Sequence, residues 1–255
     1  MNDSPSSARD HRVDFVIGGV QKGGTTALDE TLRRHPDIAM AREKEPHMFD
    51  DEQAFGSGVP DFTSYHDQWG EGLGRRRCGE ATPIYCWWPP AAQRIRDYNP
   101  AMKWVLLLRE PASRAYSHWN MERKRGRETL GFREAVAAED ARMRSASMHE
   151  SRAFSYLSRG YYARQLARLW GLFPRAQTLI LRSERFHADP ASTVDQVFRF
   201  LGVPPMALSA LPPMNAGDYD SPLDPADRAA LVAAYAPDIR ELERMTGWDL
   251  ADWLR

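Results

Sequence analysis

Short apolar runs alternate along the chain with stretches whose apolar residues repeat at helical spacing. Residues 13–18, 103–108 and 178–181 are apolar on both faces and bounded by polar or turn residues, which is typical of strands in a buried parallel sheet. Helical spacing occurs over residues 162–173 and 194–201, and again from about Asp224, where we expect Pro237 to interrupt the helix. The pattern predicts an α/β fold with a central parallel β-sheet flanked by helices.

The length and composition are those of one folded domain. The chain has 255 residues, of which 42% are hydrophobic and 27% charged, and single cores stop growing at roughly 250 to 300 residues. We therefore expect one domain over residues 13–255, preceded by a flexible polar segment over residues 1–12.

Several sequence features favour a cytoplasmic protein without membrane insertion. No apolar run approaches the roughly 20 residues that span a bilayer. The first residues lack the apolar stretch of a signal peptide. Cys78 and Cys86 do not have the short spacing of a zinc or redox pair.

Charge is nearly balanced over the whole chain but not along it. The 34 Lys and Arg residues face 35 Asp and Glu residues, for a net charge of −1, which offers no long-range attraction to a nucleic acid. Residues 109–164 hold twelve basic and seven acidic residues. This segment is a candidate for binding an anion, although ordinary solvated helix faces would look the same.

A glycine-rich loop follows the first predicted strand. Residues 18–26 read GGVQKGGTT and lead into an amphipathic stretch. Glycines let the backbone approach a ligand closely, and the free N–H groups at a helix start favour phosphate. Lys22 adds a positive charge, and Thr25 and Thr26 add hydroxyl donors. A plain glycine-rich turn is the alternative, but it needs neither the lysine nor the threonines.

The loop differs from that of nucleotide-hydrolysing proteins. Their motif places the lysine directly before Ser or Thr, whereas Lys22 precedes two glycines. The predicted strand over residues 103–108 ends in Arg109, where such proteins hold magnesium with an aspartate. We therefore expect a phosphate site without a metal ion.

Arg109 is the centre of a second candidate phosphate site. It lies at the carboxyl end of a buried strand, where ligands of open α/β sheets bind. A helix starting at Pro111 or Ala112 would place Ser117 near it, and arginine and serine together can bind a phosphate. The alternative is an arginine in a surface salt bridge.

Three motifs in their order and spacing resemble the sulfotransferases that use 3′-phosphoadenosine 5′-phosphosulfate (PAPS). They read QKGGTT, REPASRAYSHW, and RGYYARQLARLWGLFP leading to ILRSERFHADP. The closest branch is the heparan-sulfate-type and bacterial one, whose loop reads KGGT. The resemblance covers residues 13–250 and implies a P-loop-like fold, a PAPS-dependent transferase, and no need for a metal.

The resemblance also implies roles for individual residues. The 5′-phosphosulfate would be held by Lys22, Gly23, Gly24, Thr25 and Thr26, with Lys22 stabilising the charge that grows on the bridging oxygen. Arg109 and Ser117 match the pair that binds the 3′-phosphate. Arg159 and Tyr161 match a basic or aromatic contact to the nucleotide, and a simple helix start is an equal alternative for them. Residues 214–220 are acidic where eukaryotic relatives carry a basic glycine loop over the nucleotide, which leaves that last contact open.

The catalytic base is expected in residues 44–49, KEPHMF, which resemble the family stretch that contains a glutamate. Glu45 aligns with that glutamate, and its carboxylate would remove the proton of the acceptor during attack. His47 is the rival base, and in an extended loop both side chains would face the same way. Exposed loop charges are the alternative for Glu45, and a structural histidine is the alternative for His47.

The acceptor side is the least determined part of the sequence. Glu80, Trp87 and Trp88 are candidates for it, and the two tryptophans fit a core or lid equally well. Ala81 stands where eukaryotic relatives often carry a lysine. The predicted reaction is in-line attack on sulfur by a hydroxyl, less favourably an amine, of a small molecule or carbohydrate, with adenosine 3′,5′-bisphosphate (PAP) leaving.

By analogy with the family, a sugar hydroxyl or a bacterial secondary metabolite is the first expectation for the acceptor. Two other classes stay open. One is a protein that binds PAP without catalysis, and the other is a magnesium-dependent nucleotide kinase.

Overall fold

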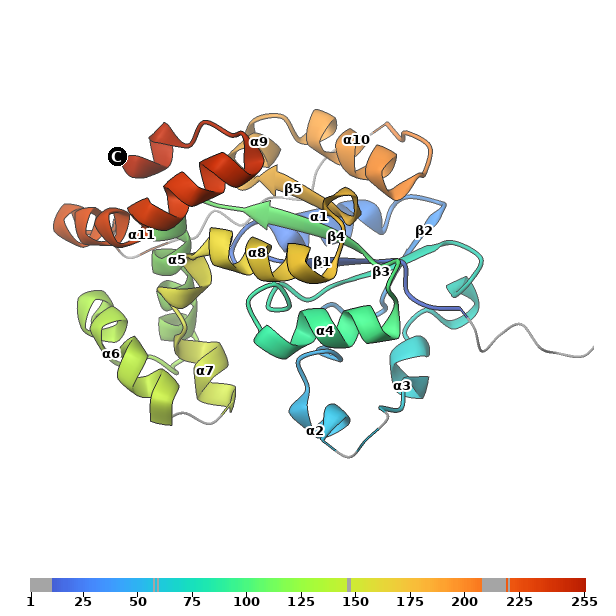
Figure 1. Ribbon diagram of the computed structural model, residues 1–255, viewed down its shortest axis with the longest axis horizontal. Helices are drawn as coiled ribbons and strands as arrows, with labels where there is room; N and C mark the ends of the chain where they lie inside the picture. Colours follow the sequence, from blue (N-terminus) through green and yellow to red (C-terminus); the bar gives the residue numbers. More distant parts are fainter. Residues whose placement is uncertain (1–10, 57, 59, 146–147, 208–218, 220) are drawn as a thin grey trace, which may run out of the picture. The chain divides into compact units, whose positions relative to one another are not determined.

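The computed structural model describes residues 11–56, 58, 60–145, 148–207, 219 and 221–255 (Figure 1). Most of the segment over residues 1–12 and of the acidic segment over residues 214–220 therefore lies outside the described residues. Contacts divide the chain into two compact units. Unit 1 comprises Met1–Val20, Gly24–Leu107 and Leu169–Met214, and unit 2 comprises Gln21–Gly23, Leu108–Arg168 and Asn215–Arg255. The predicted extent of the domain, residues 13–255, stays a prediction.

Unit 1 is built on a five-stranded sheet in the order β2-β3-β1-β4-β5. The pairs β1–β3, β1–β4 and β2–β3 are parallel. The strands are β1 (Phe15–Gly19), β2 (Ile38–Met40), β3 (Arg77–Ala81), β4 (Lys103–Leu108) and β5 (Thr178–Arg182). The predicted α/β fold with a central parallel sheet is confirmed.

The three predicted strands correspond to β1, β4 and β5, but β2 and β3 were not predicted as strands. The sequence of β3, RCGEA, contains no apolar run. It becomes a strand because it pairs with β1 on one side and β2 on the other. At Gly79 a Cβ atom would lie 2.1 Å from the Phe15 ring, so only glycine allows this close packing.

Helices cover both faces of the sheet, with α9 and α10 on the side opposite α4 in Figure 1. Apolar residues of α1, α9 and α10 share one buried cluster with β1, β4 and β5, which includes Leu28, Val105 and Phe198. On the other face, Trp104 packs against Phe173 at 5.7 Å between ring centroids. The helices of unit 1 are α1 (Thr25–Leu32), α2 (Glu52–Phe55), α3 (Thr63–His66), α4 (Pro89–Tyr98), α9 (Ser183–Ala188) and α10 (Pro190–Leu201).

Unit 2 is helical, and α5 is in contact with most of its other helices. Its helices are α5 (Pro111–Lys124), α6 (Phe132–Ser145), α7 (Met148–Phe154) and α11 (Pro225–Thr246), and α8 (Tyr162–Leu172) begins in it. The described 3-10 turns of the chain are η1 (Gly70–Gly72), η2 (Ser158–Gly160), η3 (Arg175–Gln177) and η4 (Ala251–Leu254). Tyr116 of α5 packs edge-on against Phe132 of α6, with ring centroids 5.2 Å apart.

Aspartates cap the starts of α10 and α11, and α11 contains a proline. Asp189 accepts a hydrogen bond from the Ser192 N–H at 3.1 Å and precedes the first-turn Pro190. The predicted interruption at Pro237 is wrong, because α11 is continuous to Thr246. Proline removes one backbone hydrogen bond, and the burial of the neighbouring Ile239 favours keeping the helix intact.

Candidate active site

The glycine-rich loop joins β1 to α1 in an unusual backbone conformation. Gly24 precedes α1 with a φ of 100°, and Lys22 has a φ of 72°, a region that L residues rarely occupy. A Cβ atom at Gly18 would lie 2.6 Å from the Trp104 ring. The first N–H groups of α1 have no side chain from Gly24 to cap them, which leaves them available to an anion. Thr25 is buried and Thr26 is exposed.

Lys22 lies among cations of unit 2. Arg109 donates from Nη1 to the backbone carbonyl of Lys22 at 3.1 Å. Burial lowers the pKa of Lys22, and the positive charges of Arg109 and Arg125 lower it further, while Glu122 acts in the opposite direction. The pKa of a lysine falls in this way when its ammonium lies near like charges. An anion bound beside these residues would relieve the repulsion.

Arg109 and Ser117 come from the end of β4 and from α5. Arg109 is half-buried and Ser117 is buried. Glu110 caps α5 by accepting from the N–H groups of Ala112 at 3.0 Å and Ser113 at 2.7 Å. Because Glu110 already occupies these N–H groups, a phosphate near Arg109 would depend on side chains instead of the start of α5.

Arg159 holds the loop from within unit 2. It is 3% exposed, and its guanidinium donates to Gln21 Oε1 at 2.8 Å, to Ser155 Oγ at 2.7 Å and to the Arg152 carbonyl at 2.7 Å. The bond to Gln21 positions the residue before Lys22, and the other two bonds hold the guanidinium itself. The sequence did not indicate this role. Tyr161 is half-buried, with the Arg164 guanidinium over its ring at 4.6 Å.

Two buried polar side chains of α5 were missed by the sequence analysis. Arg114 and His118 are four residues apart, and both are 0% exposed. Four of their nitrogen atoms have no hydrogen-bond partner among the described residues. These are both ring nitrogens of His118, and Nε and Nη1 of Arg114. Burial lowers the pKa of His118 well below its usual range, and Arg159, Arg114 and Lys22 lower it further, so the ring is neutral. The i, i+4 spacing was visible in the sequence, but the burial was not.

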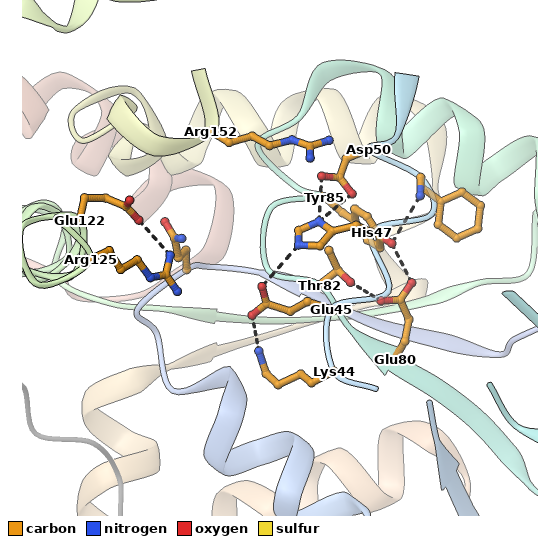
Figure 2. Close-up of polar contacts among 12 residues, drawn as sticks. Lys44, Glu45, His47, Asp50, Glu80, Thr82, Tyr85, Glu122, Arg125 and Arg152 are labelled. Carbon is orange, nitrogen blue, oxygen red and sulfur yellow. Dashed lines mark hydrogen bonds and ion pairs between the residues drawn. The ribbon is translucent and has the colours of Figure 1, made fainter. Parts of the chain in front are cut away.

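Glu122 balances part of this positive charge. It is buried and pairs with Arg125 at 3.0 Å and with Arg127 at 3.4 Å. Figure 2 shows the Glu122–Arg125 pair. Its negative charge also acts on Lys22, whose pKa it raises.

In unit 1, the loop after β2 brings charged side chains together (Figure 2). Glu45 Oε1 pairs with the Lys44 ammonium, and Glu45 Oε2 lies 3.6 Å from His47 Nε2. His47 Nδ1 lies 3.0 Å from a carboxylate oxygen of Asp50. The sequence predicted a shared face for Glu45 and His47 only in the case of an extended loop, and the two side chains lie 3.6 Å apart. The shared face does not come from an extended loop, because Glu45 and His47 have φ angles of 61° and 55°.

The ion pairs fix the protonation of this group. Burial acts to raise the pKa of Glu45, but the hydrogen bond from His47 and the charge of Lys44 outweigh it and lower the pKa to about 2. Burial acts to lower the pKa of His47, but hydrogen bonds to Asp50 and Glu45 outweigh it and raise the pKa to about 9. At neutral pH the glutamate is therefore ionised and the histidine is protonated.

Asp50 was not assigned a role from the sequence. It is 0% exposed, and both of its carboxylate oxygens lie within hydrogen-bond distance of His47 Nδ1, at 3.1 and 3.0 Å. A buried carboxylate behind a histidine fixes the orientation of the ring. The spacing of three residues from His47 was the only sign in the sequence.

Glu80, a candidate for the acceptor side, lies inside unit 1. It is 0% exposed, and its carboxylate accepts hydrogen bonds from Tyr65 Oη at 3.0 Å, from Tyr85 Oη at 2.9 Å and from Thr82 Oγ1. Burial raises the pKa of Glu80 to about 7, against the opposing effect of these hydroxyl groups. Glu80 has no exposed surface, and its place on the acceptor side stays a prediction.

Trp87 and Trp88 precede α4 and are both half-buried. Their ring centroids are 5.7 Å apart, and Trp88 Nε1 donates to Glu52 Oε1 at 2.9 Å. The remaining exposed ring surface is compatible with an acceptor contact, which stays a prediction.

The described part of the chain contains no group of three or more His, Cys, Asp or Glu side chains arranged to hold a metal ion. In the same residues, no helix is both long and apolar enough to cross a membrane. The predictions of a metal-free site and of a cytoplasmic location stay predictions.

Comparison with known proteins identifies relatives over most of the chain. A family model described as "Sulfotransferase domain" matches residues 12–211. Heparan sulfate glucosamine 3-O-sulfotransferase 3B1 of Mus musculus is 33% identical over 191 residues, covering 74% of this chain and 45% of the relative. Heparan sulfate glucosamine 3-O-sulfotransferase 6 of the same species is 32% identical over 198 residues, covering 74% and 52%. The chain thus spans about half the length of these curated relatives.

Solved structures extend the similarity to the fold. A sulfotransferase from Alicyclobacillus acidocaldarius superposes with a TM-score of 0.82 and 32% identity, covering 96% of this chain and 99% of that one. The sulfotransferase domain from the curacin biosynthetic pathway, at 15% identity and a TM-score of 0.51, shares the fold alone. On the match of the family model and the identity to these relatives, the chain belongs to the sulfotransferase family.

Proposed function

We propose that this chain transfers the sulfuryl group of PAPS to a hydroxyl of a carbohydrate or small-molecule acceptor. The observation that carries the proposal is the pair formed by Lys22 and Arg109. The Arg109 guanidinium contacts the backbone of Lys22 at 3.1 Å, and burial together with the charge of Arg109 lowers the pKa of the lysine. Such a pair favours a ligand with several negative charges, and membership of the family supports PAPS as that ligand.

The roles of the nucleotide-binding residues follow the resemblance of their motifs. The 5′-phosphosulfate would be bound by Lys22, Gly23, Gly24, Thr25 and Thr26, and the 3′-phosphate by Arg109 and Ser117. For Arg159 we propose an indirect role, because its guanidinium donates to Gln21 and to other groups of the protein. Tyr161 remains a candidate for direct contact with the nucleotide.

The proposed chemical step uses Glu45 as the general base. As the acceptor oxygen attacks sulfur, its proton moves to the Glu45 carboxylate, and the bond between sulfur and the bridging oxygen of PAPS breaks. The negative charge that develops on the leaving PAP is stabilised by Lys22. His47, protonated and held by Asp50, orients Glu45 and the acceptor and does not take the proton itself.

The names of the relatives favour a carbohydrate acceptor. The mouse proteins are named for 3-O-sulfation of glucosamine in heparan sulfate, so a sugar hydroxyl is the first acceptor class to test. Trp87 and Trp88 are the proposed acceptor contacts from unit 1. This chain carries Ala81 where eukaryotic relatives often have a lysine, so a lysine that would help to arrange catalysis there is missing.

The proposal is tested by incubating the full chain with PAPS and a panel of sugar and small-molecule hydroxyl acceptors, with and without EDTA. We expect mass spectrometry to show an acceptor that has gained one sulfuryl group, with the same yield in EDTA. PAP binding without transfer to any acceptor would instead indicate a binding protein. Transfer of a phosphoryl group from ATP that stops in EDTA would indicate a kinase.

A further inference from the structure

We propose that Tyr85 is a positioning residue, whose hydroxyl, oriented by Glu80, fixes the loop of Glu45, His47 and Asp50. The inference rests on the proposed function, because the catalytic role of that loop belongs to it. The loop and the Glu80–Tyr85 pair both lie in unit 1, and both are drawn in Figure 2.

The Glu80 carboxylate is a fixed internal acceptor. It lies in β3 and has no exposed surface. Three hydroxyl groups, from Tyr65, Thr82 and Tyr85, donate to it. A buried carboxylate is tolerated when hydrogen bonds replace its water. Because all three donors point to one carboxylate, the orientation of each hydroxyl is set by Glu80.

Tyr85 connects this acceptor to the loop. Its hydroxyl donates to Glu80 at 2.9 Å and accepts from the backbone N–H of Phe49 at 3.4 Å. The carbonyl of Phe49 accepts from Arg94 Nη1 at 3.1 Å. Phe49 directly precedes Asp50, which orients His47. The N–H of Phe49 is thus linked to β3 through Tyr85 and Glu80, and its carbonyl is linked to α4 through Arg94.

The loop needs such support because its backbone is strained. Glu45 and His47 both have positive φ angles, and residues in that region persist only where the surrounding structure holds them. The Glu45 N–H donates to the Ala81 carbonyl at 3.2 Å, which fixes the beginning of the loop. The Tyr85 hydroxyl fixes its end, next to Asp50.

The structure offers a matched control for this hydroxyl. Tyr65 and Tyr85 are both buried, and both donate to the same oxygen of Glu80, at 3.0 and 2.9 Å. Both pack edge-on against the Phe49 ring, with centroids 5.4 and 5.6 Å away. Tyr85 also accepts from the Phe49 N–H. Removing either hydroxyl therefore perturbs Glu80 equally, whereas Y85F alone releases the loop.

The test compares Y85F with Y65F in the full chain. We expect Y85F to lower kcat about tenfold, less than the roughly 100-fold that a misplacement of 1 Å can cost. KM for PAPS should stay within about twofold, because the nucleotide is bound elsewhere. Y65F should keep kcat near the wild-type value, and both variants should lower the thermal midpoint by similar amounts.

A second measurement does not depend on activity. NMR titration of His47 should show that its pKa falls in Y85F and is unchanged in Y65F, because only Y85F loosens the contact with Asp50. Equal kcat and equal His47 titration in the two variants would overturn the inference. A wild-type protein that transfers no sulfuryl group would overturn the proposed function instead, while the titration would still decide the role of Tyr85.

Discussion

The buried carboxylate of Glu80 predicts a specific dependence of stability on pH. Burial raises its pKa from 4.5 to about 7. Between these two pH values the folded protein keeps a proton that the unfolded chain has lost, so the free energy of unfolding decreases as pH rises through this window. One unit of pKa difference corresponds to about 1.4 kcal/mol. The contribution of Glu80 should therefore decrease by about 3 kcal/mol between about pH 4 and pH 8.

The assay is urea unfolding of the wild type and of Glu80→Gln at pH values across this range. The glutamine does not titrate, so the difference in unfolding free energy between the two proteins isolates the carboxyl. His47, whose pKa is raised to about 9, loses its stabilising effect as pH rises from 6.5 through 9, but it does so in both proteins. A difference that stays constant with pH would show that the folded state does not hold the proton on Glu80. If the wild type instead gained stability relative to Glu80→Gln as pH rises, the hydroxyl donors would outweigh burial in their effect on the pKa of Glu80.

Two predictions concern the nucleotide. Arg109→Ala should weaken PAP binding by about 1.5 to 3 kcal/mol, the value of a hydrogen bond to a charged group, and should affect AMP far less; calorimetry that finds equal losses for both would contradict the assignment of the 3′-phosphate. Lys22→Ala should lower the rate of transfer more than the affinity for PAP, because the charge it opposes is greatest in the transition state. A matched loss in rate and affinity would make Lys22 a binding residue only.

The parts of the fold that the sequence predicted are those with local signals. β1, β4 and β5 are centred on short apolar runs, and α11 starts at the predicted place, next to its cap Asp224. β3 has no such signal, since its polar sequence becomes a strand only between β1 and β2. The continuation of α11 through Pro237 likewise depends on packing that no local pattern contains.

Local sequence likewise predicts some residues of the candidate site and not others. Lys22 and Arg109 could be predicted because both lie in loops that follow strands, and the structure brings them into contact. Asp50 was missed because its contact with His47 depends on a left-handed backbone at His47 that the sequence does not suggest. Glu80 was a candidate for the acceptor side, and no local pattern shows that it is buried in β3 with hydroxyl donors from Tyr65, Thr82 and Tyr85.

The measurement that tests the account most directly is the rate of sulfuryl transfer by Glu45→Gln, made beside the wild type and His47→Asn. Glutamine preserves the shape of Glu45 and removes the proton acceptor, and loss of a general base costs about 10² to 10⁴-fold. We expect Glu45→Gln to lose turnover by this amount while its affinity for PAP stays near the wild-type value, and His47→Asn to keep measurable activity. An active Glu45→Gln together with an inactive His47→Asn would contradict the account and assign the base to His47.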